Sequence, residues 1–259
     1  MKDKPLLTVS RLSKRFARGS APVTAVDDVS FHIDPSETLA LAGPSGSGKS
    51  TIARLLLRLI EADAGSIRFG GEDFLALKGQ ALRRRRKKLQ LVFQDPLAAF
   101  NPRATVARAI EDPLRIHAVV PRLERADRVT TLLERVGLDP GLRGRAIHEV
   151  SGGQRQRVAI ARALATKPSL IVLDEALSAL DVSVRRRILD LLLDLQHEEK
   201  IAYLFISHDL AVVRAIAHRV LILDHGRIAE QGNARAVIDA PRSVIGRALV
   251  GAVPKLRHT

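Results

Sequence analysis

A strand pattern that runs directly into a glycine-rich loop and then into a helix constrains the fold of this chain more than any other feature. The apolar run Thr38–Ala42 precedes a glycine, four further residues and Gly-Lys-Ser, and residues 52–60 then have helical periodicity. Glycines let several N–H groups turn inward, and the helix N-terminus adds partial positive charge, so such a loop binds phosphate. An ordinary glycine-rich turn before a helix is the alternative.

In the phosphate-binding interpretation, Lys49 reaches the outer phosphates of a nucleotide and Ser50 holds Mg²⁺. The phosphate loop predicted to contact the nucleotide consists of Gly43, Pro44, Ser45, Gly46, Ser47, Gly48, Lys49, Ser50 and Thr51.

Two carboxylates end a second apolar run. Residues 170–173 are apolar and are followed by Asp174 and Glu175. The C-terminal ends of central parallel strands face the ligand crevice of an α/β sheet, so we expect Asp174 to support the Mg²⁺ shell and Glu175 to polarise the attacking water. The pair could instead cap a helix, and taken alone the two interpretations are equally favoured. The phosphate loop earlier in the chain favours the first.

Gln94 and His208 follow two further apolar runs, residues 91–93 and residues 204–206. At a strand end, Gln94 can touch both the metal and a movable segment, and the imidazole of His208 can hydrogen-bond a terminal phosphate. A solvent-facing glutamine and a structural histidine are the alternatives for each residue alone. The position of His208 after the acidic pair favours the functional interpretation.

Residues 151–154 open another helical pattern with a motif of similar physics. A serine hydroxyl, glycine N–H groups and a helix N-terminus again point at a phosphate. The residues predicted to make these contacts are Ser151, Gly152, Gly153 and Gln154.

Over nearly its whole length the chain resembles the ATP-binding subunit of an ABC transporter. The phosphate loop is similar to the Walker A motif, residues 170–175 to the Walker B motif, and residues 151–154 to the signature motif. Gln94 is similar to the Q-loop glutamine and His208 to the switch histidine.

Two more positions carry the resemblance. Residues 178–181 resemble the D-loop, which places Asp181 at the nucleotide, and Phe16 falls where the family has an aromatic that stacks on adenine. A core phenylalanine is the alternative for Phe16.

The resemblance implies an α/β fold: a P-loop NTPase core, RecA-like with a mostly parallel sheet, a helical insertion and an N-terminal antiparallel β portion. It implies an ATPase that uses ATP and Mg²⁺. The implied catalytic residues are Glu175, His208, Lys49 and Gln94, and the implied metal ligands are Ser50, Gln94 and Asp174. It also implies that the signature motif closes over the ATP of a second cassette, identical or paralogous, in a head-to-tail pair.

The strand and helix patterns predict how this single cassette is organised. We expect the α/β core in residues 1–90 and 166–235, the helical subdomain in 91–165 and a tail in 236–259. Predicted helices cover residues 104–117, broken by Pro113, residues 122–136 and residues 184–199, and Asp224-His225-Gly226 predicts a hairpin turn. The leucines expected in the core from the last helix are Leu189, Leu192, Leu193 and Leu195.

The composition agrees with a protein that does not span a membrane itself and works by binding to membrane proteins. The 259 residues are 46% hydrophobic, yet no stretch approaches the roughly 18 consecutive apolar residues of a membrane span. Residues 1–5 begin no signal-peptide pattern, and the lack of cysteine excludes thiolate metal sites and is typical of cytosolic proteins. We expect a peripheral location at the cytoplasmic face of the inner membrane, bound to transmembrane permease subunits.

The net charge of +14 includes a basic run over residues 83–88. Such a run is usually a solvated face, and it can also draw a protein to nucleic acid or to anionic lipid. A nucleic-acid ATPase is therefore the competing function. Only 3% of residues are aromatic, so few side chains are present on which the bases of a nucleic acid could stack. We therefore expect no direct nucleic-acid partner.

Residues 92–103 resemble the permease-facing stretch of the peptide/nickel importer subfamily, and Gly251-Ala252-Val253-Pro254 resembles its tail. Glu175-Ala176-Leu177-Ser178 departs from the Glu-Pro-Thr-Ser common in peptide importers, and residues 241–244 lack their His-Pro-Tyr-Thr. These departures favour nickel, with a peptide importer as the alternative. Substrate choice would belong to the permease and an extracytoplasmic binding protein.

Overall fold

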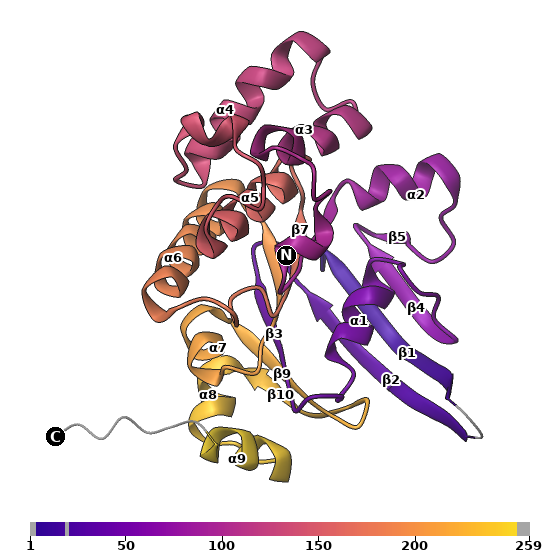
Figure 1. Ribbon diagram of the computed structural model, residues 1–259. Helices are drawn as coiled ribbons and strands as arrows, with labels where there is room; N and C mark the ends of the chain where they lie inside the picture. Colours follow the sequence, from indigo (N-terminus) through magenta and orange to yellow (C-terminus); the bar gives the residue numbers. More distant parts are fainter. Residues whose placement is uncertain (1–3, 19–20, 253–259) are drawn as a thin grey trace, which may run out of the picture. The chain divides into compact units, whose positions relative to one another are not determined.

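The computed structural model describes residues 4–18 and 21–252, which form two compact units (Figure 1). The first unit combines the chain up to Gly79 with the chain from Ala202 onward, and the second is Gln80–Ile201. The predicted helical insertion, residues 91–165, lies inside the second unit. Two stretches used in the sequence analysis lie partly outside the described residues. They are residues 1–3 of the stretch examined for a signal peptide, and Val253 and Pro254 of the stretch that resembles the subfamily tail.

An antiparallel sheet forms one layer of the first unit. Its strands are β1 (Leu7–Arg18), β2 (Ala21–Ile33), β4 (Ala64–Phe69) and β5 (Glu72–Asp73), in the order β2-β1-β4-β5. Leu7, Val9 and Leu12 of β1 are buried, and β-bulges interrupt its register. This sheet confirms the predicted N-terminal antiparallel portion.

Parallel strands form the other layer of this unit. The strand β3 (Thr38–Ala42) lies parallel to both β8 (Ala202–Ile206) and β9 (Arg219–Asp224). Every residue of β3 and β8 is buried, because helices cover both faces of such sheets and strands of this kind are continuously apolar. The predicted hairpin at Asp224-His225-Gly226 is confirmed, because β10 (Arg227–Asn233) pairs antiparallel with β9.

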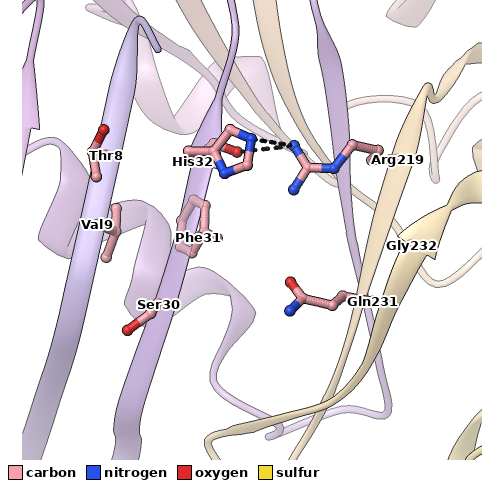
Figure 2. A pocket seen from close by; sticks show the side chains of 8 residues that line it. All are labelled: Thr8, Val9, Ser30, Phe31, His32, Arg219, Gln231 and Gly232. Carbon is pink, nitrogen blue, oxygen red and sulfur yellow. Dashed lines mark hydrogen bonds between the residues drawn. The ribbon is translucent and has the colours of Figure 1, made fainter. Parts of the chain in front are cut away.

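Polar side chains tie β2 to the β9–β10 hairpin. At one end Arg227 donates to Asp27, with Nη2 to Oδ2 at 2.6 Å. At the other, Arg219 Nη1 lies 3.3 Å from Nε2 of His32 on β2 (Figure 2). The same Nη1 donates to Oε1 of Glu37, in the turn after β2, at 3.0 Å. A cavity of about 470 Å³ lies beside this second link, and Gln231 faces it from β10.

The helices of the first unit are α1 (Lys49–Leu56), α7 (Leu210–Ile216), α8 (Ala234–Asp239) and α9 (Val244–Gly251). Glu230 of β10 fixes the start of α9, because it accepts hydrogen bonds from the Ser243 hydroxyl at 2.6 Å and the Arg242 N–H at 2.9 Å. Burial opposes ionisation here, but these hydrogen bonds dominate and lower the pKa of Glu230.

Acid is expected to weaken this link. Since the folded-state pKa of Glu230 is lowered, its carboxylate stabilises the fold above the unfolded pKa of about 4.3, and that contribution disappears as pH falls through the folded value. The difference in unfolding free energy between the native chain and Glu230→Gln should therefore shrink at the acid end of a urea-unfolding series. A difference that stays constant with pH would contradict this.

The second unit contains a parallel strand pair and a group of helices. The strands are β6 (Leu89–Val92) and β7 (Leu170–Asp174). The helices are α2 (Gly79–Arg86), α3 (Val106–Ile116), α4 (Arg125–Arg135), α5 (Gly152–Leu164) and α6 (Val182–Glu199), with 3-10 turns at Pro96–Ala99, Arg122–Glu124 and Pro140–Gly144. Within the described ranges, no helix is long and apolar enough to cross a membrane.

Three predictions about these helices were wrong. Pro113 does not break α3, which continues to Ile116 because a buried face that includes Val106, Ile110 and Leu114 holds it against its neighbours. Leu193 is 40% exposed and is not a core residue. Helix α6 begins at Val182 rather than at residue 184, since Asp181 caps it.

Helix α6 ends at Glu199 and is capped by Lys200, whose φ of 56° is left-handed. A side chain in that conformation costs about 1–2 kcal/mol, and glycine avoids the cost. Lys200→Gly is therefore expected to raise the free energy of unfolding by about 1 kcal/mol, measured by urea unfolding. Lys200→Ala keeps the β-carbon and should not. Equal effects of both substitutions would show that loss of the lysine charge, not backbone conformation, is responsible.

Candidate nucleotide-binding site

The phosphate loop leaves β3 with the backbone conformation that its glycines permit. Gly43 has a φ of 151° and Gly48, which caps α1, has a φ of 107°. A β-carbon at Gly43 would lie 2.4 Å from the Leu223 carbonyl oxygen, and one at Gly48 would lie 2.4 Å from that of Ala25. The first turn of α1 contains no acidic residue, so its N-terminal N–H groups keep their positive potential.

Lys49 is buried inside this loop, with 6% of its surface exposed. Its Nζ donates to the carbonyl oxygens of Gly43 at 2.9 Å and Pro44 at 2.7 Å. The loop therefore wraps around an ammonium group, which is the geometry that a phosphate clamp needs. Ser50, the predicted metal ligand on this loop, is partly exposed at the start of α1.

His208 emerges at the same sheet edge as the phosphate loop. Leu41 of β3 pairs with Ile206 of β8, and the Ser207 N–H donates to the Leu41 carbonyl at 3.3 Å. His208 is exposed, and Asp209 after it caps α7 by accepting from the Ala211 N–H at 3.0 Å. A predicted phosphate sensor and the predicted phosphate loop thus follow neighbouring parallel strands.

Phe16 lies on β1 with 39% of its surface exposed, so it is not the core residue that was the alternative. It pairs with Val23 of β2, two residues from Ala25, whose carbonyl borders Gly48. Lys14 Nζ lies 5.6 Å from the ring centroid. The ring is therefore available near the phosphate loop.

In the second unit, Gln94 and the acidic pair share another strand edge. Val92 of β6 pairs with Leu173 of β7, so Gln94 and Asp174 follow adjacent parallel strand ends. Gln94 is exposed, whereas Asp174 and Glu175 are half-buried. Glu175 has a left-handed φ of 49°, and its carbonyl accepts hydrogen bonds from the Ser178 N–H at 3.1 Å and hydroxyl at 2.9 Å.

The signature motif caps α5. The Ser151 oxygen accepts from the Gln154 N–H at 3.2 Å, and Gln154 Oε1 accepts from the Ser151 N–H at 2.9 Å. This capping box orders the motif while Ser151 and Gly152 stay exposed. Since the hydroxyl oxygen accepts, its proton is free to donate to an anion.

A cavity of about 390 Å³ opens beside the signature motif. Two arginines that were not predicted as site residues, Arg157 of α5 and Arg187 of α6, line it with Ser151 and Gly153. Arg157 donates to the Val136 carbonyl, and burial together with the Arg187 charge lowers the pKa of Arg157. Helical spacing from Gly153 and Gln154 was the available signal for Arg157.

Asp181, the predicted D-loop residue, accepts hydrogen bonds from the Val184 N–H at 2.9 Å and the Ser183 hydroxyl at 2.8 Å. These two bonds, in that order, lower the pKa of Asp181. Val184 lines the same cavity as Gly153, so the D-loop and the signature motif are neighbours.

Gly153→Ala should test the close approach of Gly153 to Val184. A β-carbon there would lie 2.6 Å from Val184 Cγ1, so we expect a loss of about 1–3 kcal/mol in unfolding free energy. At Gly152 a β-carbon has its nearest neighbour at 3.9 Å, and Gly152→Ala should stabilise by up to about 1 kcal/mol. Urea unfolding measures both. Adding Val184→Ala should rescue Gly153→Ala, and additive effects would exclude the contact.

Arg162 joins α5 to the turn after Gln94. Its Nη1 donates to the Ala99 carbonyl at 2.6 Å, and its guanidinium lies 4.7 Å from the centroid of the Phe100 ring. Burial lowers the pKa of Arg162. The helix that carries the signature motif is thereby attached to the predicted permease-facing stretch.

The donors predicted for a metal, on Ser50, Gln94 and Asp174, are all oxygens, which suits Mg²⁺ held largely by phosphates. Across the described residues, no group of three or more histidine, cysteine, aspartate or glutamate side chains could hold a metal ion by itself.

Comparisons with known proteins show the family of the chain. The family model described as ABC transporter matches residues 26–178, more than half of the chain. The glutathione import ATP-binding protein GsiA of Escherichia coli strain K12 is 50% identical over 97% of this chain, and that of Salmonella paratyphi A is 50% identical over 98%. The chain spans only 41% and 42% of the length of these relatives.

Solved structures agree. The dimeric, post-hydrolysis ATP-binding cassette MJ0796 with ADP and Pi is 29% identical, with a TM-score of 0.80 over 88% of this chain and 99% of that one. The cassette cbiO1 of Clostridium perfringens, part of the cbiONQ transporter complex, is 28% identical, with a TM-score of 0.80 over 92% of each chain. These matches confirm the predicted P-loop NTPase fold.

Proposed function

Because the chain belongs to the ABC transporter family, we propose that it is an ATP-hydrolysing subunit that energises import through membrane permease subunits. The observation that carries the proposal is the phosphate loop closed around buried Lys49, with His208 at the neighbouring strand end. The second unit carries the complementary motifs. Relatives named as import ATP-binding proteins support the direction of transport.

In the proposed reaction, the phosphate loop and Lys49 bind the outer phosphates of ATP, and Glu175 orients water for in-line attack. Ser50, Gln94 and Asp174 would hold Mg²⁺, which supplies charge neutralisation at the phosphate oxygens when bound. His208 donates a hydrogen bond to the terminal phosphate. Phe16 stacks on the base.

We further propose that two cassettes close head to tail, so that the Ser151 hydroxyl and the N-terminus of α5 face a phosphate bound by the other cassette. The capping box supports this, since it leaves that hydroxyl proton available. The dimeric cassette structure with ADP and Pi supports the pairing. The partner can be a second copy or a paralogue.

A small peptide is the substrate class that we propose, since the relatives that match most of this chain are named for the import of glutathione, a tripeptide. The names of these relatives therefore favour the peptide alternative over nickel. Peptide selection would be made by an extracytoplasmic binding protein and the permease, from which the cassette receives a signal.

One experiment tests the whole proposal. The chain is co-purified with the permease subunits that bind it, reconstituted, and assayed for ATP hydrolysis with the binding protein loaded with glutathione, a dipeptide or nickel. We expect stimulation by a peptide ligand. Stimulation by nickel alone would reassign the substrate, and an absence of hydrolysis in the intact complex would overturn the ATPase assignment.

A further inference from the structure

A group of basic side chains on the second unit has no part in the proposed ATP site. Helix α2 has no buried residue, and the turn after it leads into β6. The basic patch consists of Arg83, Arg84, Lys87, Lys88 and Lys167, and all of these except the half-buried Lys87 are exposed.

Three segments bring the patch together. Arg83 of α2 donates to the carbonyl of Ile116 at the end of α3. Lys88 Nζ donates to the Lys167 carbonyl at 3.0 Å, and the Lys88 carbonyl accepts from the Ser169 N–H at 2.9 Å. These bonds fix the charged groups of Arg83 and Lys88 and hold the three segments that carry the patch, so the patch lies on an ordered surface and not on a loose tail.

The charge of the patch is not compensated locally. Within the described chain, no acidic side chain lies in salt-bridge distance of Arg83, Arg84, Lys87, Lys88 or Lys167, whereas arginines elsewhere, such as Arg135 with Glu198, are paired. Burial, followed by the charges of Arg83 and Lys87, lowers the pKa of His117 at the end of α3. The positive potential therefore extends over that helix end.

We infer that the basic patch docks on the anionic phospholipid surface of a bilayer. Each lysine or arginine near such a surface adds attraction, and clusters of four to eight are typical of lipid-binding proteins. Ile116 beside the patch is 47% exposed and offers an apolar contact at the headgroup level. The patch contains no aromatic side chain on which bases could stack, so nucleic acid fits it less well.

The inference rests on the proposed function only in that an import subunit works beside a membrane; the patch shares no residue with the ATP site. It predicts direct lipid contact, in addition to any contact with a permease. Attraction between exposed charges weakens as salt rises, because the Debye length is about 10 Å at 0.1 M salt.

The purified full chain is to be sedimented with vesicles of phosphatidylcholine alone or mixed with phosphatidylglycerol. We expect binding only to the anionic vesicles, weakened by salt. The triple variant Arg84→Gln, Lys87→Gln, Lys167→Gln should bind on the order of 100-fold more weakly, since none of these side chains makes a hydrogen bond or ion pair within the described residues.

The matched control removes three exposed arginines from the other unit, as Arg235→Gln, Arg242→Gln, Arg247→Gln. It should bind nearly as well as the native chain, and Arg84→Lys should keep full binding. Equal losses in both triple variants would overturn the inference in favour of diffuse charge. Competition by duplex DNA at lower concentration than anionic lipid would overturn it in favour of nucleic acid.

ATP hydrolysis separates this inference from the proposed function. The patch variant should hydrolyse ATP at the native rate while losing vesicle binding. A native chain that hydrolyses ATP but does not bind anionic vesicles would contradict the lipid inference alone. A chain that binds the vesicles through the patch but does not hydrolyse ATP in its intact complex would contradict the proposed function alone.

Discussion

Glu175→Gln is expected to bind ATP with near-native affinity and to lower the rate of ATP hydrolysis by about 10²–10⁴-fold, the range for loss of a general base. Glutamine keeps the size and hydrogen-bonding reach of the side chain but cannot accept a proton from water. It also adopts the left-handed backbone of residue 175 at a cost similar to that of glutamate. The fold should therefore be preserved, and trapped ATP should favour the closed pair of cassettes.

Single-turnover hydrolysis and nucleotide binding measure the two quantities separately. Glu124→Gln, at an exposed glutamate in a 3-10 turn, is the matched control and should hydrolyse at the native rate. A near-native rate in Glu175→Gln would remove Glu175 from the catalytic role. Glu175→Gly should be inactive yet more stable by about 1 kcal/mol, since glycine takes the left-handed φ of 49° without strain.

Lys49→Ala is expected to weaken ATP binding by roughly 100-fold, or about 3 kcal/mol, because charge-assisted hydrogen bonds to the phosphates are lost. The effect should be large because Lys49 is buried within the loop, where solvent screens its charge little. Equilibrium binding of a fluorescent ATP analogue measures it. Lys78→Ala, at an exposed lysine of the same unit, controls for net charge and should bind normally.

Gly48→Ala separates the charge of the loop from its shape. The ammonium group of Lys49 stays, but a β-carbon would meet the Ala25 carbonyl at 2.4 Å in a backbone with a φ of 107°. ATP affinity should fall here as well. Unchanged affinity in Lys49→Ala would count against the phosphate-loop assignment, whereas unchanged affinity in Gly48→Ala alone would show only that the loop adapts.

The motifs could be predicted from the sequence because each depends on residues that are close together in the chain. A loop such as residues 43–51 must contain glycines where φ is positive, and Ser151 with Gln154 forms its capping box within one turn. The hairpin at Asp224-His225-Gly226 was predictable for the same reason. Parallel β3 and β8 were recognisable as continuous apolar runs that helices cover on both faces.

Features set by contacts between distant residues escaped prediction. Pro113 stays inside α3 because tertiary packing outweighs its local cost, and the exposure of Leu193 depends on which neighbours α6 meets. Arg157 and Arg187 meet in one cavity although they are separated by thirty residues of chain. The sequence pattern of either helix alone contains no sign of that encounter.

The bond between Arg162 and the Ala99 carbonyl has a mechanical consequence. Arg162 and Ser151 lie at opposite ends of one helix, and eleven residues at 1.5 Å each separate them by about 16 Å. A helix of this length bends little, so its two ends move together. We therefore expect a displacement of the turn at Ala99 to displace Ser151 by a similar amount. Inserting one residue into α5 would also rotate Ser151 by about 100° around the helix axis relative to Arg162, which would turn its hydroxyl away from the phosphate that it is proposed to face.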